Sequence, residues 1–99
     1  MVKRPMVAPE VCVHQHSGKR YEIHVSLPQV KKENIELNFS KKGFCVKALR
    51  GDVIFAACHA LEFPVDTNKI RTKYYDVEGL LEIIAPILKP VKTKRIPIG

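Results

Sequence analysis

The sequence lacks any apolar stretch of the roughly 18 residues that a membrane-spanning helix needs. The first ten residues contain Lys3 and Arg4 but no apolar run behind them, so they do not resemble a secretory signal. We therefore predict a cytoplasmic protein with no membrane partner. A chain of 99 residues is expected to form one domain.

Cysteine is scarce, and its spacing suggests no shared role. The three cysteines Cys12, Cys45 and Cys58 contain no Cys-x-x-Cys pair, and an odd number argues against a disulfide framework or a zinc site. Each cysteine has apolar or strand-like neighbours, where a free thiol behaves as a small hydrophobic side chain. We predict that all three are free and structural.

One short segment has the residue types of a metal site. Cys12, His14 and His16 alternate with other residues, so on a strand all three would share one face. Sulfur and imidazole nitrogen suit zinc or copper. Three such residues lie along a line, however, and the outer two are roughly 13 Å apart by strand rise. We therefore predict a solvated strand face and no metal site.

Signatures of catalysis are also missing. The chain has no Gly-x-Ser-x-Gly, no P-loop, no His-Glu-x-x-His and no Cys–His pairing at a recognisable spacing. No two acidic residues stand out from the polar strand faces as an acid–base pair. We predict no catalytic residue, no bound cofactor and no enzymatic activity.

Aromatic residues are few, although the net charge is +7: the chain has three tyrosines and four phenylalanines. None alternates with basic residues as a base-stacking sheet requires. The basic pairs at 19–20, 31–32 and 41–42 fall between apolar runs, and the densest basic cluster is at 92–95. We interpret them as solvated loops and tail, and predict no nucleic-acid partner.

The dominant hydrophobic period is two residues. Apolar and polar residues alternate over 21–27, 35–39, 44–48 and 70–74, and further strands are expected at 11–13 and 80–84. Turn residues separate them: Lys41 to Gly43, Arg50 to Asp52, and Asp76 to Gly79. The segment 34–49 is predicted to be a hairpin. About seven short strands at this spacing are typical of an antiparallel β-sandwich.

One predicted strand, 53–63, is apolar on both faces. Val53, Phe55, Ala57, His59, Leu61 and Phe63 fall on one face. Ile54, Ala56, Cys58 and Ala60 fall on the other. A strand of this kind is buried on both faces, in the sandwich or at an interface. We predict that the second set forms a dimer contact.

The composition changes after Pro86. Pro90 and Pro97 exclude a helix and a central strand from the last residues, which read as an extended tail ending on Ile96, Pro97 and Ile98. We therefore divide the chain into a short arm at 1–10, a sandwich domain at 11–86 and a tail at 87–99.

The order of these segments resembles the alpha-crystallin domain of the small heat-shock proteins. YEIHVSLPQV at 21–30 is similar to the family's strand followed by Leu-Pro-Gly-Val, and KKENIEL at 31–37 to its charged turn and next strand. FPVDTNKI at 63–70 resembles its Pro-x-Asp-x-x-x-Ile segment, and GLLEI at 79–83 its Gly-Val-Leu-x-Ile/Val strand. Ile96, Pro97 and Ile98 match its C-terminal Ile-x-Ile/Val motif. The resemblance implies an all-β, immunoglobulin-like antiparallel sandwich.

The resemblance also implies a function. Members of this family are ATP-independent chaperones that bind unfolding proteins, prevent their aggregation and self-associate as dimers and larger oligomers. By analogy, the tail motif of one subunit docks in an apolar groove of another. The residues implied to line this groove, which also binds clients, are Ile35, Leu37, Phe39, Ile70 and Thr72.

Three departures from the family pattern keep an alternative open. Only Arg50-Gly51-Asp52 separates two strands where many relatives carry a longer excursion with a swapped strand. The turn before Gly79 is about two residues longer than usual, and few residues precede the first strand. A short sandwich without a swapped strand also resembles the CS-domain co-chaperones, adaptors that bind another chaperone. The Ile-Pro-Ile tail favours the small heat-shock proteins.

Overall fold

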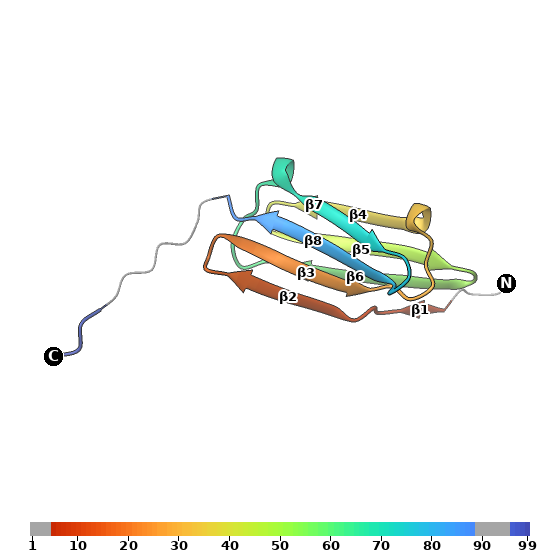
Figure 1. Cartoon of the computed structure of the whole chain (residues 1–99), viewed down its shortest axis with the longest axis horizontal. Coiled ribbons are helices and arrows are strands. Elements are labelled where there is room, and N and C mark those ends of the chain that lie inside the picture. Colours follow the sequence, from red (N-terminus) through yellow and green to blue (C-terminus); the bar gives the residue numbers. More distant parts are fainter. Residues whose placement is uncertain (1–4, 89–95) are drawn as a thin grey trace.

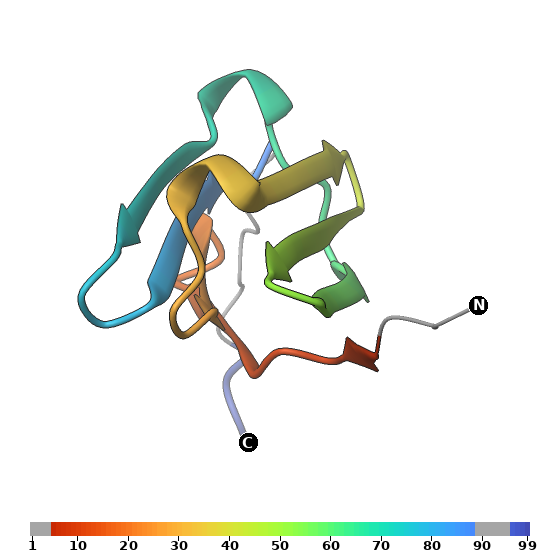
Figure 2. The same cartoon turned by 90° about the vertical axis from the view of Figure 1, so that its right-hand side faces the viewer.

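The computed structural model, which describes residues 5–88 and 96–99, is a sandwich of two four-stranded sheets. Figure 2 shows the sheets end-on as two layers, and in Figure 1 one sheet lies in front of the other. The first sheet has the strand order β1 (Met6–Val7), β6 (Val53–Ala60), β5 (Gly43–Arg50), β4 (Ile35–Ser40). The second has the order β2 (Val11–His16), β3 (Arg20–Ser26), β8 (Leu80–Pro86), β7 (Arg71–Tyr75). The predicted all-β sandwich is confirmed.

The strands follow the predicted alternation closely. All neighbouring strands pair in antiparallel fashion except β1 and β6, which are parallel. The predicted hairpin at 34–49 is formed by β4 and β5. Two short 3-10 helices, Lys32–Asn34 and Thr67–Lys69, lie in the connections. No helix in residues 5–88 and 96–99 has the length and apolar character to cross a membrane.

The core lies between the sheets, where alternate side chains of each strand meet. Ile23 and Ile83 are directly opposite in the β3–β8 ladder, and both are fully buried. The buried residues are Tyr21, Ile23, Val25, Leu27, Val30, Phe44, Val46, Ala48, Phe55, Leu61, Val65, Leu81, Ile83, Ala85 and Ile87. Burial of one face per strand is the reason that the period of two predicted these elements.

The strand ends show where sequence reasoning was less accurate. Strand β1 was not predicted, and β2 is twice as long as the predicted segment 11–13. Strand β6 ends at Ala60, three residues earlier than expected, and Pro86 is the last residue of β8. Proline has no backbone N–H to donate to the ladder, so it is tolerated at the end of a strand, where that hydrogen bond is not needed.

Strand β6 is not buried on both faces within one chain. Phe55 is buried and points into the core, whereas Ile54 and Ala56 are half-buried and Cys58 and Ala60 are exposed. These four outward side chains are thus available for the predicted dimer contact, which stays a prediction.

The prediction of three free cysteines is wrong for two of them. Cys45 of β5 and Cys58 of β6 are directly opposite in the ladder and form a disulfide, with their Cα atoms 4.1 Å apart. Cys12 is free and exposed. Counting thiols and looking for Cys-x-x-Cys missed the bond because cross-strand register, and not local spacing, brings the two together.

Two tight turns define the ends of the sandwich. Gly51 has a positive φ of 57° in the two-residue turn that joins β5 to β6, so no longer excursion leaves the sandwich there. Gly79 has φ 66°, and a Cβ on it would lie 2.7 Å from the Cα of Pro28. Only glycine fits this close approach, which holds the turn before β8 against the end of β3.

Candidate functional site: a groove between the two sheets

The two long edges of the sandwich are closed differently. At one edge the chain itself crosses from one sheet to the other, because β1 belongs to the first sheet and β2 to the second (Figure 2). At the other edge, β4 and β7 are the outermost strands of their sheets. A groove with a cavity volume of about 220 Å³ lies between them. The groove has an apolar base and a basic rim, formed by Lys32, Ile35, Leu37, Thr72, Lys73, Tyr74 and Leu81.

The structure brings together three of the five predicted groove residues. Ile35 and Leu37 of β4 and Thr72 of β7 line the groove. Phe39 instead lines a hollow near the other end of β4, and Ile70 lines a third one with Pro86. The role of these residues in binding stays a prediction, but only the first three share one cavity.

Sequence reasoning missed four residues that line the groove, Lys32, Lys73, Tyr74 and Leu81. Of these, Tyr74 is held by hydrogen bonds. Its hydroxyl donates to the carbonyl oxygens of Leu27, at 2.9 Å, and Val30, at 2.7 Å. Burial raises the pKa of this hydroxyl above its ordinary value of 10.0. The tyrosine thereby ties β7 to the loop after β3 and fixes one wall of the groove. Its alternation with Thr72 along the strand was a signal that could have identified it.

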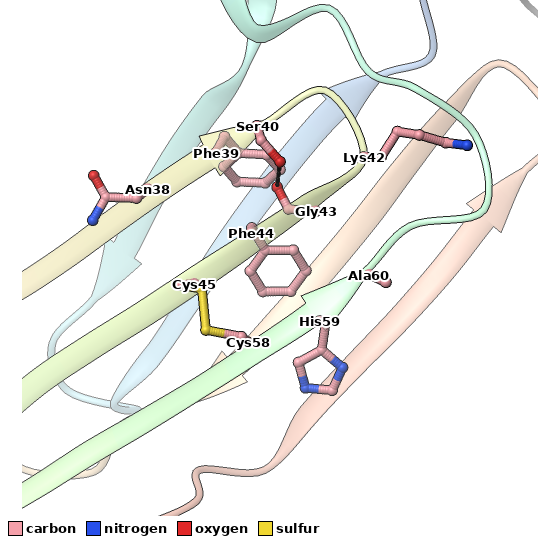
Figure 3. Close-up of a pocket in the computed structure, with 10 residues that line it drawn as sticks. All are labelled: Asn38, Phe39, Ser40, Lys42, Gly43, Phe44, Cys45, Cys58, His59 and Ala60. Atoms are coloured by element: carbon pink, nitrogen blue, oxygen red, sulfur yellow. Dashed lines mark hydrogen bonds between the residues drawn. A yellow bond between two sulfur atoms is a disulfide. The ribbon is translucent and has the colours of Figure 1, made fainter.

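The hollow that contains Phe39 has a different character (Figure 3). Its volume is about 450 Å³. The ring of Phe44 stacks between Phe39 and His59, with centroids 5.3 and 5.5 Å away. The Cys45–Cys58 disulfide lies in the same wall. This hollow joins β4, β5 and β6 within one sheet, so it is separate from the groove between the sheets.

The structure describes the tail motif at 96–98, at the end of the chain. Ile96 and Ile98 are 69% and 98% exposed, and the C-terminus lies away from the sandwich in Figure 1. Two accessible isoleucines are therefore available to a binding surface. The basic cluster at 92–95 lies outside the described residues.

Part of the β6 edge is also available. Strand β1 pairs with β6 at Ile54 and Phe55 only. Within the part of the chain that the structure describes, no strand pairs with this edge from Ala56 to Ala60. An edge with free backbone donors and acceptors is a template for pairing with another chain.

Comparison with solved structures shows which known proteins have a similar fold. Heat shock protein 16.0 from Schizosaccharomyces pombe superposes with a TM-score of 0.76 at 19% identity, over 94% of this chain and 99% of that one. The chain has the fold of the small heat-shock proteins. No protein-family model matches the sequence, and no curated protein matches it.

Two further structures support the same fold. A mutant of hsp14.1 from Sulfolobus solfatataricus P2 gives a TM-score of 0.73 at 17% identity, over 91% of this chain and 80% of that one. A small heat-shock protein from Xylella fastidiosa gives 0.68 at 20% identity, over 92% and 95%. The resemblance predicted from the sequence thus extends to the three-dimensional small heat-shock fold over nearly the whole chain.

Proposed function

We propose that this protein is an ATP-independent chaperone of the small heat-shock type, which holds unfolding proteins and self-associates. The observation that carries the proposal is the groove at the open β4–β7 edge, lined in part by Ile35, Leu37 and Leu81, in a chain with this fold that also ends in two exposed isoleucines. Unfolded clients expose apolar segments, so a chaperone that holds them needs an apolar surface that can be uncovered.

The tail motif is suited to covering this groove in a neighbouring subunit. Pro97 favours an extended backbone at Ile96, and an extended segment can lie along a sheet edge. Burying two isoleucines contributes roughly 3–6 kcal/mol, whereas ordering each tail residue costs about 1–2 kcal/mol. One docked tail is therefore weak, but several in one assembly reinforce each other. Reversible assembly is the expected behaviour.

The dimer contact is proposed to be β6. Its unpaired edge from Ala56 to Ala60 adjoins the outward side chains of Ile54 and Ala56, so backbone and apolar contacts would be made together. The short turn at Gly51 leaves no strand to exchange, which makes edge contact the more direct route.

We also propose a cytoplasmic location and no enzymatic activity. The Cys45–Cys58 disulfide is unusual for the first proposal, because disulfides persist in oxidising compartments and are rare in the cytosol. The location can be checked by alkylating free thiols inside the producing cells before lysis, which preserves the redox state of each cysteine. Cys45 and Cys58 should be trapped as thiols in a reducing cytosol, and an intact bond in unlysed cells would contradict that location.

The proposed function can be tested by heating an aggregation-prone client without ATP, with and without this protein. Heat is preferable to a reducing agent because a reductant would also break the Cys45–Cys58 disulfide. We expect suppressed light scattering near equimolar ratios. The double variant Ile96→Ala, Ile98→Ala should form smaller species than the parent chain. Val77→Ala, at an exposed turn position, is the matched control.

Two results together would contradict this proposal. They are an unchanged mass of the tail variant and no suppression at a several-fold molar excess. That outcome would favour the co-chaperone alternative, in which the sandwich binds another chaperone.

A further inference from the structure

The outer face of the second sheet gathers imidazole and carboxylate groups from three strands. Glu22 and His24 are two residues apart on β3, so they share its outward face. Glu82 of β8 is directly opposite His24, and His14 of β2 is directly opposite Glu22. Glu22, His24 and Glu82 therefore form a triangle across two paired strands, unlike the line of residues within β2.

The ligand atoms of this triangle lie close to one another. The Nε2 atom of His24 is 4.0 Å from a Glu22 oxygen and 3.8 Å from a Glu82 oxygen, and all three groups fall within 4.8 Å. A tetrahedral zinc ion with bonds of about 2.0–2.1 Å holds its ligands about 3.3–3.4 Å apart. Small side-chain rotations would close the difference, because each side chain is about one third exposed.

A second observation points to a ligand at this place. The Nε2 atom of His24 is inaccessible to solvent and has no hydrogen-bond partner within the described chain. Its distances to the two carboxylates are too long for hydrogen bonds. A buried polar atom of this kind calls for a specific cause, and an ion bound between the three groups is one such cause.

His16 holds one of the carboxylates in place. Its Nε2 atom is 3.0 Å from one oxygen of Glu22, and the other oxygen of Glu22 faces His24. This hydrogen bond is the main reason that the pKa of Glu22 is lowered below its ordinary value of 4.5. Ligating carboxylates are commonly oriented by such a second hydrogen bond.

The charges around the triangle leave the carboxylates available. Among residues 5–88 and 96–99, neither Glu22 nor Glu82 forms an ion pair with a lysine or arginine. Lys73 of β7 is opposite Glu82, but its ammonium lies 4.9 Å from the ring centroid of Tyr75. Cys12, opposite His24 on β2, is exposed and is not one of the three grouped residues.

We propose that Glu22, His24 and Glu82 bind one zinc ion on the outer face of β3 and β8, with His16 positioning Glu22. Two carboxylates balance the charge of Zn²⁺, and imidazole favours zinc over calcium or magnesium. Three protein ligands are too few for calcium, which takes six to eight oxygens. Zinc is usually four-coordinate and tetrahedral in proteins, so three protein ligands leave its fourth position to a water molecule.

The test is calorimetric titration of the untagged, metal-free full chain with zinc chloride, alongside its Cys12→Ser variant. We expect one zinc ion per chain in both, and no heat from calcium or magnesium. His24→Gln and Glu82→Gln should each weaken zinc binding at least tenfold, and His16→Gln by about tenfold or more. His59→Gln, on the opposite sheet, is the matched control and should bind as the parent does.

Thermal unfolding with a chelator present separates ligand loss from misfolding, because the variants should then unfold at nearly the parent temperature. Zinc should raise the midpoint of the parent and of His59→Gln, but not of His24→Gln. Three outcomes would overturn the site: no zinc binding by the parent, unchanged binding by His24→Gln and Glu82→Gln, or loss of binding in Cys12→Ser.

Discussion

The outer faces of the two sheets differ in chemistry although their inner faces are alike. On the second sheet, β3 presents Glu22, His24 and Ser26 outward, a polar set that alternates strictly with core residues. On the first sheet, β6 presents Ile54 and Ala56, followed by Cys58 in a disulfide. The inner faces define the fold, whereas the outer faces differ in what they can bind: one suits ions and water, the other suits another protein chain.

The largest effect is expected from making the apolar outer face of β6 polar. If β6 forms the proposed dimer contact, the double variant Ile54→Lys, Ala56→Glu should convert dimers to monomers, because both new charges would have to leave water at the contact. Light scattering measures the mass. Val77→Lys, at an exposed turn position, is the control and should keep the parent mass. A folded double variant that stays dimeric would exclude β6 as the contact.

The disulfide and the free cysteine offer a second comparison between the sheets. Replacing Cys45 and Cys58 together with alanine should lower the free energy of unfolding by about 3 kcal/mol, since a loop of this length loses its cross-link in the unfolded state. Cys12→Ala on β2 should change it by less than about 0.5 kcal/mol. Denaturant unfolding measures both. Equal effects of the two changes would show that the cross-link does not stabilise the sandwich.

The smallest effect is expected from removing one hydrogen bond on the polar outer face of the second sheet. Removing the hydrogen bond with His16→Ala should raise the pKa of Glu22 back toward 4.5. A carboxyl whose pKa is lower in the folded than in the unfolded state stabilises the fold above its unfolded pKa, and this contribution is lost as the pH falls through the folded pKa. The parent should therefore lose this stabilisation below about pH 4.5.

Nuclear magnetic resonance of the Glu22 carboxyl, recorded against pH with a chelator present, measures this change directly. The control variant His59→Ala should leave the titration of Glu22 unchanged. An unaltered Glu22 pKa in His16→Ala would mean that the 3.0 Å contact contributes little in solution.

The strands were predictable because burial of one face acts locally. The alternation of residues 21–27 reappears in β3 almost residue for residue, and the strand expected at 80–84 is found as β8. Strand β1 was not predictable in this way, because two residues carry no period and they pair only with an edge that distant residues form. Local patterns indicate strands, but not which strands pair.

Cross-strand pairs show where more could have been inferred. The turn at Arg50 to Asp52 was predicted, and counting outward from it in both directions brings Cys45 opposite Cys58. The disulfide was therefore within reach of sequence reasoning. The pairing of His24 with Glu82 was not, because these two residues are 58 positions apart in the sequence and no turn fixes the register of their strands. The same limit explains why Phe39 and Ile70, which line other hollows, were grouped with the residues of the groove.

The two-residue turn at Gly51 has a consequence for the exchange of subunits between assemblies. Every described strand of the sandwich pairs within its own chain, so parting from a neighbour would require no unfolding. The rate of subunit exchange should then be limited by dissociation at the edge and at the tails. Mixing two differently labelled populations and following energy transfer measures that rate, which should be much faster than global unfolding under the same conditions. If the protein assembles as proposed, each chain should keep its fold while subunits part and recombine.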